Sequence, residues 1–387
     1  RYTELGVEVI QGSAKITSPW SVEIKTAEGT QTLTTRSIVI GTGARPFVPP
    51  LPGIEEVDYL TSDNIWNLRE QPERLLVLGG GPIGSELTQA FSRLGSKVTL
   101  VQRRDRILVQ EDPDVSEMVV RRFHDEGIDV HLQHQPKRFL IENGEKVLIC
   151  EDLANDNAEV RIPFDQVLVA LGRSANTSGF GLEELDIPLN DCGTIETNEY
   201  LQTAYRNIYA CGDVAGPFQY THTAAHQAWY SAVNALFDPF KKFRADYSVI
   251  PHATFTDPEV ARVGINELDA KEQGIAYEVT TFGIDDLDRA IADEEAHGMV
   301  KVLTVPGKDK ILGAAIVGEH AGDLLAEYVL AMRHGIGLNK ILGTIHIYPT
   351  MAEANKYVAG NWKRAHAPEG LLRWVKRFHS WRRGGEK

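Results

Sequence analysis

Three glycines in the stretch 74–106 have the spacing that is needed to hold a phosphate group. Gly79, Gly81 and Gly84 stand in G-x-G-x-x-G order directly after the apolar run 75–78. In this spacing the first glycine makes a tight turn, and the second lets backbone N–H groups approach a pyrophosphate. The third allows a helix and a strand to pack closely. The pattern therefore predicts the binding of a dinucleotide.

The elements around the glycines are those that such a site requires. The run 75–78 predicts a strand, and a second apolar run at 98–101 predicts another. Between them, apolar residues recur at a helical period at Ile83, Leu87, Ala90, Phe91 and Leu94. Any tight strand-to-helix turn can carry a lone glycine pattern, but a complete βαβ unit favours the dinucleotide.

The end of the second strand should distinguish NAD from NADP. An acidic residue there would bind the ribose 2′-hydroxyl of NAD, whereas arginine suits the 2′-phosphate of NADP. The sequence has Gln102, then Arg103 and Arg104. We therefore predict NADP, with NAD as the alternative, because Gln102 can also bind a ribose hydroxyl and the arginines can be a solvated strand end.

Composition excludes several classes of function. The 387 residues are enough for two or three domains, and 42% hydrophobic with 24% charged residues is typical of a soluble globular protein. A formal net charge of -14 argues against nucleic acid as a partner. No apolar run has the length of a membrane span, and no signal peptide is visible. Cys150, Cys192 and Cys211 form no CxxC pattern, so we expect a reducing, cytoplasmic compartment and a core-packing role for each.

Three further buried runs end in glycine turns. The run 38–40 leads to Gly41-Thr42-Gly43, the run 167–171 to Gly172-Arg173, and the run 207–211 to Gly212-Asp213. We expect these turns to place polar groups at one edge of a sheet, where open α/β sheets bind ligands. An antiparallel meander should precede them, and an antiparallel α+β unit should follow residue 246.

Five motifs in order make the chain similar to the flavin-dependent pyridine nucleotide-disulfide oxidoreductases, the family of dihydrolipoyl dehydrogenase and mercuric reductase. They are found at 41–46, 79–86, 171–176, 209–214 and 255–264. The similarity extends to about Gly360, and Ala175 departs from the family's usual proline. The resemblance implies an α/β fold in which a Rossmann-type NAD(P)-binding domain is inserted in a FAD-binding domain. A C-terminal α+β dimerisation domain would follow.

The resemblance also implies the domain boundaries. We assign 1–53 and 174–246 to the FAD-binding domain, 54–173 to the NAD(P)-binding domain, 247–360 to the dimerisation domain, and 361–387 to a basic amphipathic tail. The family's opening segment carries another G-x-G-x-x-G and a Cys-x4-Cys pair that the flavin reduces. Neither pattern occurs here, so we expect the FAD-binding domain to be truncated.

Single residues acquire roles from the same resemblance. FAD would be lined by Thr42, Gly43, Arg173, Gly212 and Asp213. Asp213 would bond the ribityl chain, although it could instead cap a turn, and Arg173 could be purely structural. Glu86 resembles a buried glutamate beside flavin and nicotinamide that is paired with a lysine, but the helix dipole also favours a glutamate in a first turn.

Near its end the family's dimerisation domain carries His-Pro-Thr, with a glutamate five positions after the histidine. Here Tyr348 occupies the histidine position and Glu353 the glutamate position. A phenol with a pKa of about 10 is a hydrogen-bond donor or a metal-facing oxygen rather than a base at neutral pH, which argues against dihydrolipoyl-type catalysis. His346 would face the same side of an extended segment and could substitute, or it could be bonded within the domain interface.

The implied function is hydride transfer from NAD(P)H through FAD to a cysteine pair, and then to a small disulfide or a thiol-bound metal ion, in a homodimer. Two alternatives remain open: a flavin-linked NADH dehydrogenase without a redox disulfide, and a non-catalytic fragment that binds nucleotide and dimerises.

After Asn361, aromatic and basic residues alternate with the spacing of an amphipathic helix. Such a helix could lie on an anionic membrane surface, bind a partner or pack on its own dimer.

Overall fold

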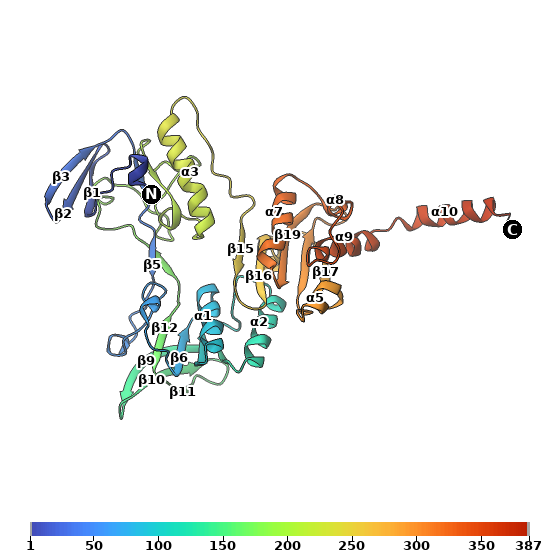
Figure 1. Ribbon diagram of the computed structural model, residues 1–387, viewed down its shortest axis with the longest axis horizontal. Coiled ribbons are helices and arrows are strands. Elements are labelled where there is room, and N and C mark those ends of the chain that lie inside the picture. Colours follow the sequence, from blue (N-terminus) through green and yellow to red (C-terminus); the bar gives the residue numbers. More distant parts are fainter. Residues whose placement is uncertain (1, 385–387) are drawn as a thin grey trace. The chain divides into compact units, whose positions relative to one another are not determined.

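The structure, a computed structural model, describes residues 2–384. The chain forms two compact units and passes between them three times (Figure 1). One unit comprises Arg1–Glu70 and Leu168–Tyr247, and the other comprises Gln71–Val167 and Ser248–Lys387.

The first unit opens with the antiparallel meander that the alternating pattern predicts. Its strands are β1 (Ser13–Ser18), β2 (Ser21–Thr26) and β3 (Gly29–Thr34). Two small sheets follow, built from β4 (Ile38–Ile40), β5 (Ala44–Pro46), β13 (Arg173–Ala175) and β14 (Ile208–Ala210). In them β4 pairs with β14 in parallel and β5 pairs with β13 antiparallel. The helix α3 (Thr221–Phe237) completes the unit.

The expectation that three glycine turns meet at one sheet edge is wrong for one of the three strands. The strand β12 (Gln166–Val169) belongs to a different sheet from β4 and β14. Arg173 nevertheless bonds the carbonyl of Ala44, directly after the glycine turn at 41–43, because β13 pairs with β5. The site is assembled by the common edge of β4 and β14 together with the short antiparallel pair of β5 and β13.

The second unit contains the predicted βαβ element. Its parallel sheet has the order β12-β6-β7-β8, with β6 (Arg74–Leu78), β7 (Lys97–Gln102) and β8 (Asp129–Leu132). The helices are α1 (Pro82–Arg93) and α2 (Pro113–Asp125), and an antiparallel sheet contains β9 (His134–Glu142), β10 (Glu145–Asp152) and β11 (Ala158–Phe164). Leu75 to Leu78 are at most 1% exposed, as expected for a central parallel strand with both faces covered.

A five-stranded antiparallel sheet forms the rest of this unit. Its order is β15-β16-β19-β18-β17, with the strands β15 (Pro251–Thr254), β16 (Glu259–Gly264), β17 (Glu278–Gly283), β18 (Met299–Thr304) and β19 (Ile311–Gly318). The helices are α4 (Glu267–Glu272), α5 (Asp288–Ala292), α6 (Ala321–Leu324), α7 (Ala326–Arg333), α8 (Leu338–Leu342) and α9 (Glu353–Ala365). A buried apolar core joins the sheet to these helices through residues such as Ile316, Tyr328 and Trp362.

The predicted amphipathic helix, α10, is Glu369–Arg382. The prediction is wrong for the start of the tail, because residues 361–365 belong to α9 and Trp362 is buried in the core, and residues 385–387 lie outside the described part of the chain. Unlike α9, α10 has no buried residue. Within residues 2–384, no helix combines the length and the apolar character that crossing a bilayer demands.

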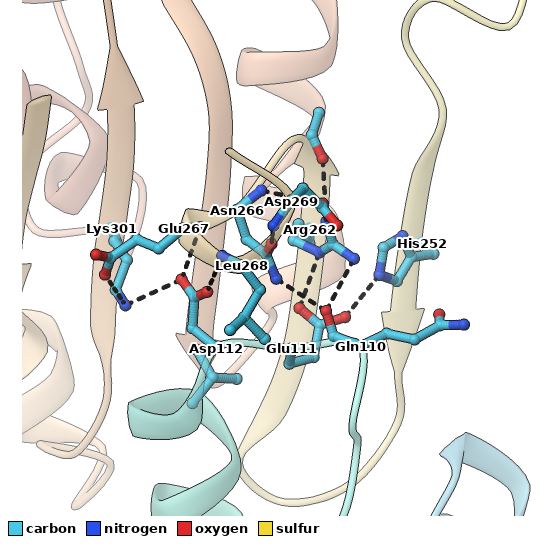
Figure 2. Close-up of polar contacts among 12 residues, drawn as sticks. Gln110, Glu111, Asp112, His252, Arg262, Asn266, Glu267, Leu268, Asp269 and Lys301 are labelled. Carbon is cyan, nitrogen blue, oxygen red and sulfur yellow. Dashed lines mark hydrogen bonds and ion pairs between the residues drawn. The ribbon is translucent and has the colours of Figure 1, made fainter. Parts of the chain in front are cut away.

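A network of charged side chains joins the parallel-sheet part of the second unit to its antiparallel sheet (Figure 2). The ammonium of Lys301, with 2% of its side chain exposed, lies 3.2 Å from Asp112, 2.6 Å from Asp114 and 3.2 Å from Glu267. Burial alone would lower the pKa of Lys301, but the bond to Asp114 and the charge of Asp112 outweigh it, so this pKa lies above its ordinary value.

Glu111 is the centre of the second half of the network. It lies 2.8 Å from His252 and 2.9 Å from Arg262, whose guanidinium also bonds Asp269 at 2.7 Å. Burial tends to raise the pKa of Glu111, but the His252 bond and the Arg262 charge lower it below its ordinary value. The Glu111 carboxylate is therefore held ionised by its bonds to His252 and Arg262.

Candidate active site

The glycine turn after β6 has the geometry that the spacing predicts. Gly79 has a φ of +103°, in the region that side chains disfavour, and its N–H donates to the carbonyl of Val101 at 2.9 Å. A Cβ on Gly80 would lie 2.6 Å from Ile107. The motif accepts any residue at this position, but here glycine is needed for the backbone to pack against Ile107. A Cβ on Gly81 would meet no atom within 4 Å. The open side of the turn is therefore at Gly81.

The start of α1 suits a bound diphosphate. Gly81 is its N-cap and makes no side-chain cap bond, while Pro82 fills the first helical position. The backbone N–H groups of the first turn have no intrahelical acceptor, and the helix dipole adds partial positive charge. Gly84 is buried within this helix. Gly79 and Gly81 thus form the turn, with Gly84 in the first turn of the helix behind it, and this arrangement fits the diphosphate of a dinucleotide.

The predicted 2′-phosphate residues lie at the same edge of the sheet. Leu78 and Val101 are neighbours in parallel strands, so Gln102, the last residue of β7, lies beside the glycine turn. Arg103 and Arg104 follow and are exposed. In the part of the chain that the structure describes, neither guanidinium makes an ion pair.

Three side chains of α1 bond the turn between β15 and β16. Glu86 accepts the N–H of Phe255 at 2.9 Å. Gln89 exchanges two hydrogen bonds with the backbone of Asp257, at 2.7 and 2.8 Å. Arg93 pairs with the Asp257 carboxylate. Gln89 and Arg93 were missed in the sequence, although their spacing from Glu86 would have revealed a polar stripe on one helix face.

Glu86 is not in the first turn of α1, which contains no acidic residue. Its proposed lysine partner does not occur among the described residues, where Glu86 makes no ion pair. Burial raises the pKa of Glu86, and the bond from Phe255 lowers it only in part. This carboxyl therefore holds a proton more readily than an exposed glutamate does.

The five residues predicted to line FAD come together in the first unit. The Arg173 guanidinium lies 3.5 Å from the Asp213 carboxylate and donates to the Ala44 carbonyl at 2.8 Å. Thr42 donates through its hydroxyl to the Asn176 carbonyl at 2.8 Å, and the N–H of Asn176 donates to the Gly43 carbonyl at 2.9 Å.

The turn at Gly212 and Asp213 is fixed by a residue that the sequence did not single out. Gln227 is fully buried on α3 and accepts the N–H of Gly212 at 2.6 Å. Its amide group donates to the Gly216 carbonyl at 2.7 Å and to the Tyr247 hydroxyl at 2.8 Å. Gly212 has a φ of +77°, so the amide holds a turn that favours glycine.

His346 and Tyr348 do not face the same side. The His346 side chain is 6% exposed and bonds Glu327 at 3.1 Å and the Thr344 carbonyl at 3.0 Å. Tyr348 is 66% exposed, and its hydroxyl donates to Asp288 at 2.7 Å. The segment turns here instead of running straight, so the alternation expected of an extended segment does not apply.

Glu353 is 4% exposed and is not bonded to Tyr348. It accepts the N–H of Thr350 at 3.4 Å and the hydroxyl of Tyr357 at 3.5 Å. The hydrogen bond to Asp288 raises the pKa of Tyr348, because the carboxylate stabilises the protonated phenol. Tyr348 is thus a proton-bearing, exposed hydroxyl at neutral pH.

The three cysteines are free thiols. Burial raises the pKa of Cys150 to about 12, and it also raises the pKa of Cys211. The core-packing prediction is wrong for Cys192, which is exposed. It lies on a turn at 191–193, where no packed element covers it.

Comparison with known proteins agrees with these arrangements. The family model described as "Pyridine nucleotide-disulphide oxidoreductase" matches residues 1–228, and its dimerisation domain matches residues 250–359. The mercuric reductase of Staphylococcus aureus is 36% identical over 356 residues, which are 92% of this chain and 63% of that protein. The dihydrolipoyl dehydrogenase of Chlamydia muridarum is 34% identical over 358 residues, 90% of this chain and 73% of that one.

A solved structure is similar in fold as well. The Cu(II) complex of the HOCl-induced flavoprotein disulfide reductase RclA from Escherichia coli superposes with a TM-score of 0.83 at 28% identity, and the match covers 91% of this chain and 78% of that one. The chain spans 63% and 64% of the mercuric reductases of Staphylococcus aureus and Lysinibacillus sphaericus. The chain therefore belongs to the pyridine nucleotide-disulphide oxidoreductases, a family of flavin-dependent enzymes that use FAD together with NAD(P)H.

Proposed function

We propose that the whole protein is an FAD-dependent NADPH oxidoreductase that reduces a thiol-bound metal ion through a cysteine pair. The observation that carries this proposal is the convergence of Thr42-Gly43, Arg173 and Gly212-Asp213 from three distant segments. Bound FAD supplies the two-electron step between a nicotinamide and a disulfide. The redox pair of the proposal is not among the three cysteines of these 387 residues.

The residues of this chain would bind and orient the two cofactors. Asp213, held by Arg173, would accept a hydroxyl of the ribityl chain, and the open turn at Gly43 would let the cofactor approach the backbone. The uncapped start of α1 would hold the diphosphate of the nicotinamide dinucleotide. Among the described residues the guanidiniums of Arg103 and Arg104 make no ion pair, which supports NADP, because a 2′-phosphate would give them an anionic partner.

The surroundings of Tyr348 support a cationic substrate. Its phenol bonds Asp288, and the charge of Glu353 also acts on it. Negative charge favours a metal centre, which is positively charged, over the sulfur atoms of a disulfide, which are not. The similarity to mercuric reductases points the same way. Glu86, with its raised pKa, would hold a proton close to the nicotinamide site.

We also propose a homodimer in a reducing, cytoplasmic compartment, with the five-part domain division given above. The dimerisation-domain match supports the dimer. So does the exposure of Ile345 and Ile347, at 96% and 78%, because a second copy would cover these apolar side chains. The three free cysteines support the compartment.

The test uses the whole protein. We expect a flavin absorption band that NADPH bleaches faster than NADH does, and a smaller preference after Arg103→Ala/Arg104→Ala. NADPH oxidation should be faster with a thiol complex of Hg(II) than with oxidised glutathione. Tyr348→Phe should lower kcat/KM for the metal. Absence of the flavin band contradicts the flavin assignment, whereas preferential turnover of glutathione disulfide contradicts only the substrate.

A further inference from the structure

The helix α10 presents an apolar face that no described part of the chain covers. Its apolar residues recur every three or four positions, as on one side of a helix. Their exposed fractions are 56% for Leu371, 53% for Leu372, 61% for Trp374, 39% for Phe378 and 74% for Trp381. Large side chains with this exposure mark an interaction surface rather than scattered surface residues.

The opposite side of the helix is basic. Arg373, Lys376 and Arg377 lie away from the apolar row, at helical angles between those of Leu372 and Trp374. The stretch 361–387 contains eight lysines and arginines and two glutamates, a net charge of +6. Because the whole chain carries -14, the remaining 360 residues carry -20. Positive charge is thus concentrated in the tail of an acidic protein.

The two tryptophans are placed at the border of the two sides. Trp374 and Trp381, one heptad apart, stand between the leucines and Arg377. Phe378 lies between them, with ring centroids 5.8 Å from Trp374 and 6.0 Å from Trp381. An indole has an apolar body and a polar N–H, so this border position suits the headgroup level of a bilayer.

We propose that α10 binds the surface of an anionic lipid bilayer, with its apolar row in the acyl boundary and its basic side at the lipid phosphates. Charge complementarity selects this occupant, since each Lys or Arg gains attraction from anionic headgroups. The helix lies in the membrane plane and does not cross the bilayer. This proposal goes beyond the redox function and does not depend on it.

The test is flotation of the full chain with vesicles of phosphatidylcholine, alone or mixed with phosphatidylglycerol. We expect binding only to the anionic vesicles, and we expect added salt to weaken it. Arg373→Gln/Arg377→Gln should weaken binding roughly 30-fold, from the attraction of two charges. The matched control Lys363→Gln/Arg364→Gln removes two charges from α9, whose apolar Trp362 is buried, and should have little effect.

Removal of α10 after Ala367 should abolish flotation. Because the helix has no buried residue, the thermal unfolding midpoint should not change. Equal binding to neutral vesicles, or equal losses from the two charge pairs, would overturn the proposal. A third result would also overturn it: the full chain does not bind vesicles, and the truncated chain is monomeric. The helix would then dock on a second copy of the chain.

Discussion

Gln227 holds the turn that carries Asp213 through three hydrogen bonds, and all of its side chain is buried. We predict that Gln227→Leu destabilises the protein by about 2–5 kcal/mol, because it leaves the N–H of Gly212 and the carbonyl of Gly216 without partners. Denaturant unfolding measures the loss. Tyr247→Phe removes only one of the three bonds and should cost about 1 kcal/mol. Equal losses in the two variants would contradict this role.

Glu86 gives a prediction about pH. Since its folded-state pKa is raised, the folded protein binds this proton more tightly than the unfolded chain does. The contribution of Glu86 to stability is therefore largest in acid and is lost as the pH rises through the raised pKa. Glu86→Gln should become more stable relative to the native protein as the pH rises above about 4 and through the raised pKa of Glu86, as urea unfolding would show. The exposed control Glu70→Gln should show no such trend.

The sequence predicts residues whose role depends on local chain geometry. The glycine turn and the arginines after β7 were visible because their spacing along the chain is short. Gln89 and Gln227 were not, since each lies in a helix and bonds backbone groups of another segment. His346 was misplaced because its orientation depends on Glu327, 19 residues away.

At the scale of elements, the Lys301 network fixes β18 to the residues that start α2. Removing one partner of a buried ion pair leaves an uncompensated charge, here on Asp112, which is 1% exposed. We predict that Lys301→Met lowers the free energy of unfolding by about 3–5 kcal/mol. Lys308→Met, at an exposed position, is the matched control. Similar small effects for both lysines would show that the network contributes no net stability.

Helices and strands could be predicted from the sequence because apolar periodicity and turn-forming glycines act locally. The meander β1 to β3, the βαβ unit and the antiparallel strands from β15 onward lie where the pattern places them. The sheet membership of β12 did not follow. A buried apolar run identifies a strand but not its neighbour, and β12 pairs with β6, about 90 residues away.

At the scale of the whole molecule, self-association should depend on the exposed segment around Tyr348. We predict that Ile345→Ser/Ile347→Ser raises the dimer dissociation constant at least tenfold, because two apolar side chains lose the cover of a second copy. Sedimentation equilibrium measures this constant. Ile141→Ser, which removes a half-exposed isoleucine on β9, should leave it unchanged. An unaltered dimer in the double variant would place the interface elsewhere.

The order of the motifs identified the family from the sequence alone, and the comparisons confirmed it. From the sequence, residues 54–173 and 247–360 were assigned to two separate domains, and the grouping of Gln71–Val167 with Ser248–Lys387 in one compact unit was not predicted. It depends on which long-range contacts form after the chain has crossed between units three times, and no local pattern records those contacts.

The helix α1 begins at the glycine turn after β6, and its side chains Glu86, Gln89 and Arg93 bond residues 255–257. The two halves of the second unit are consequently not interchangeable parts. A chimaera that borrows residues 71–167 from a relative to change its coenzyme would bring a foreign helix to this junction. The junction would keep its hydrogen bonds only if the loop before Pro258 came from the same relative. A change of coenzyme by domain exchange should therefore transfer the two segments together.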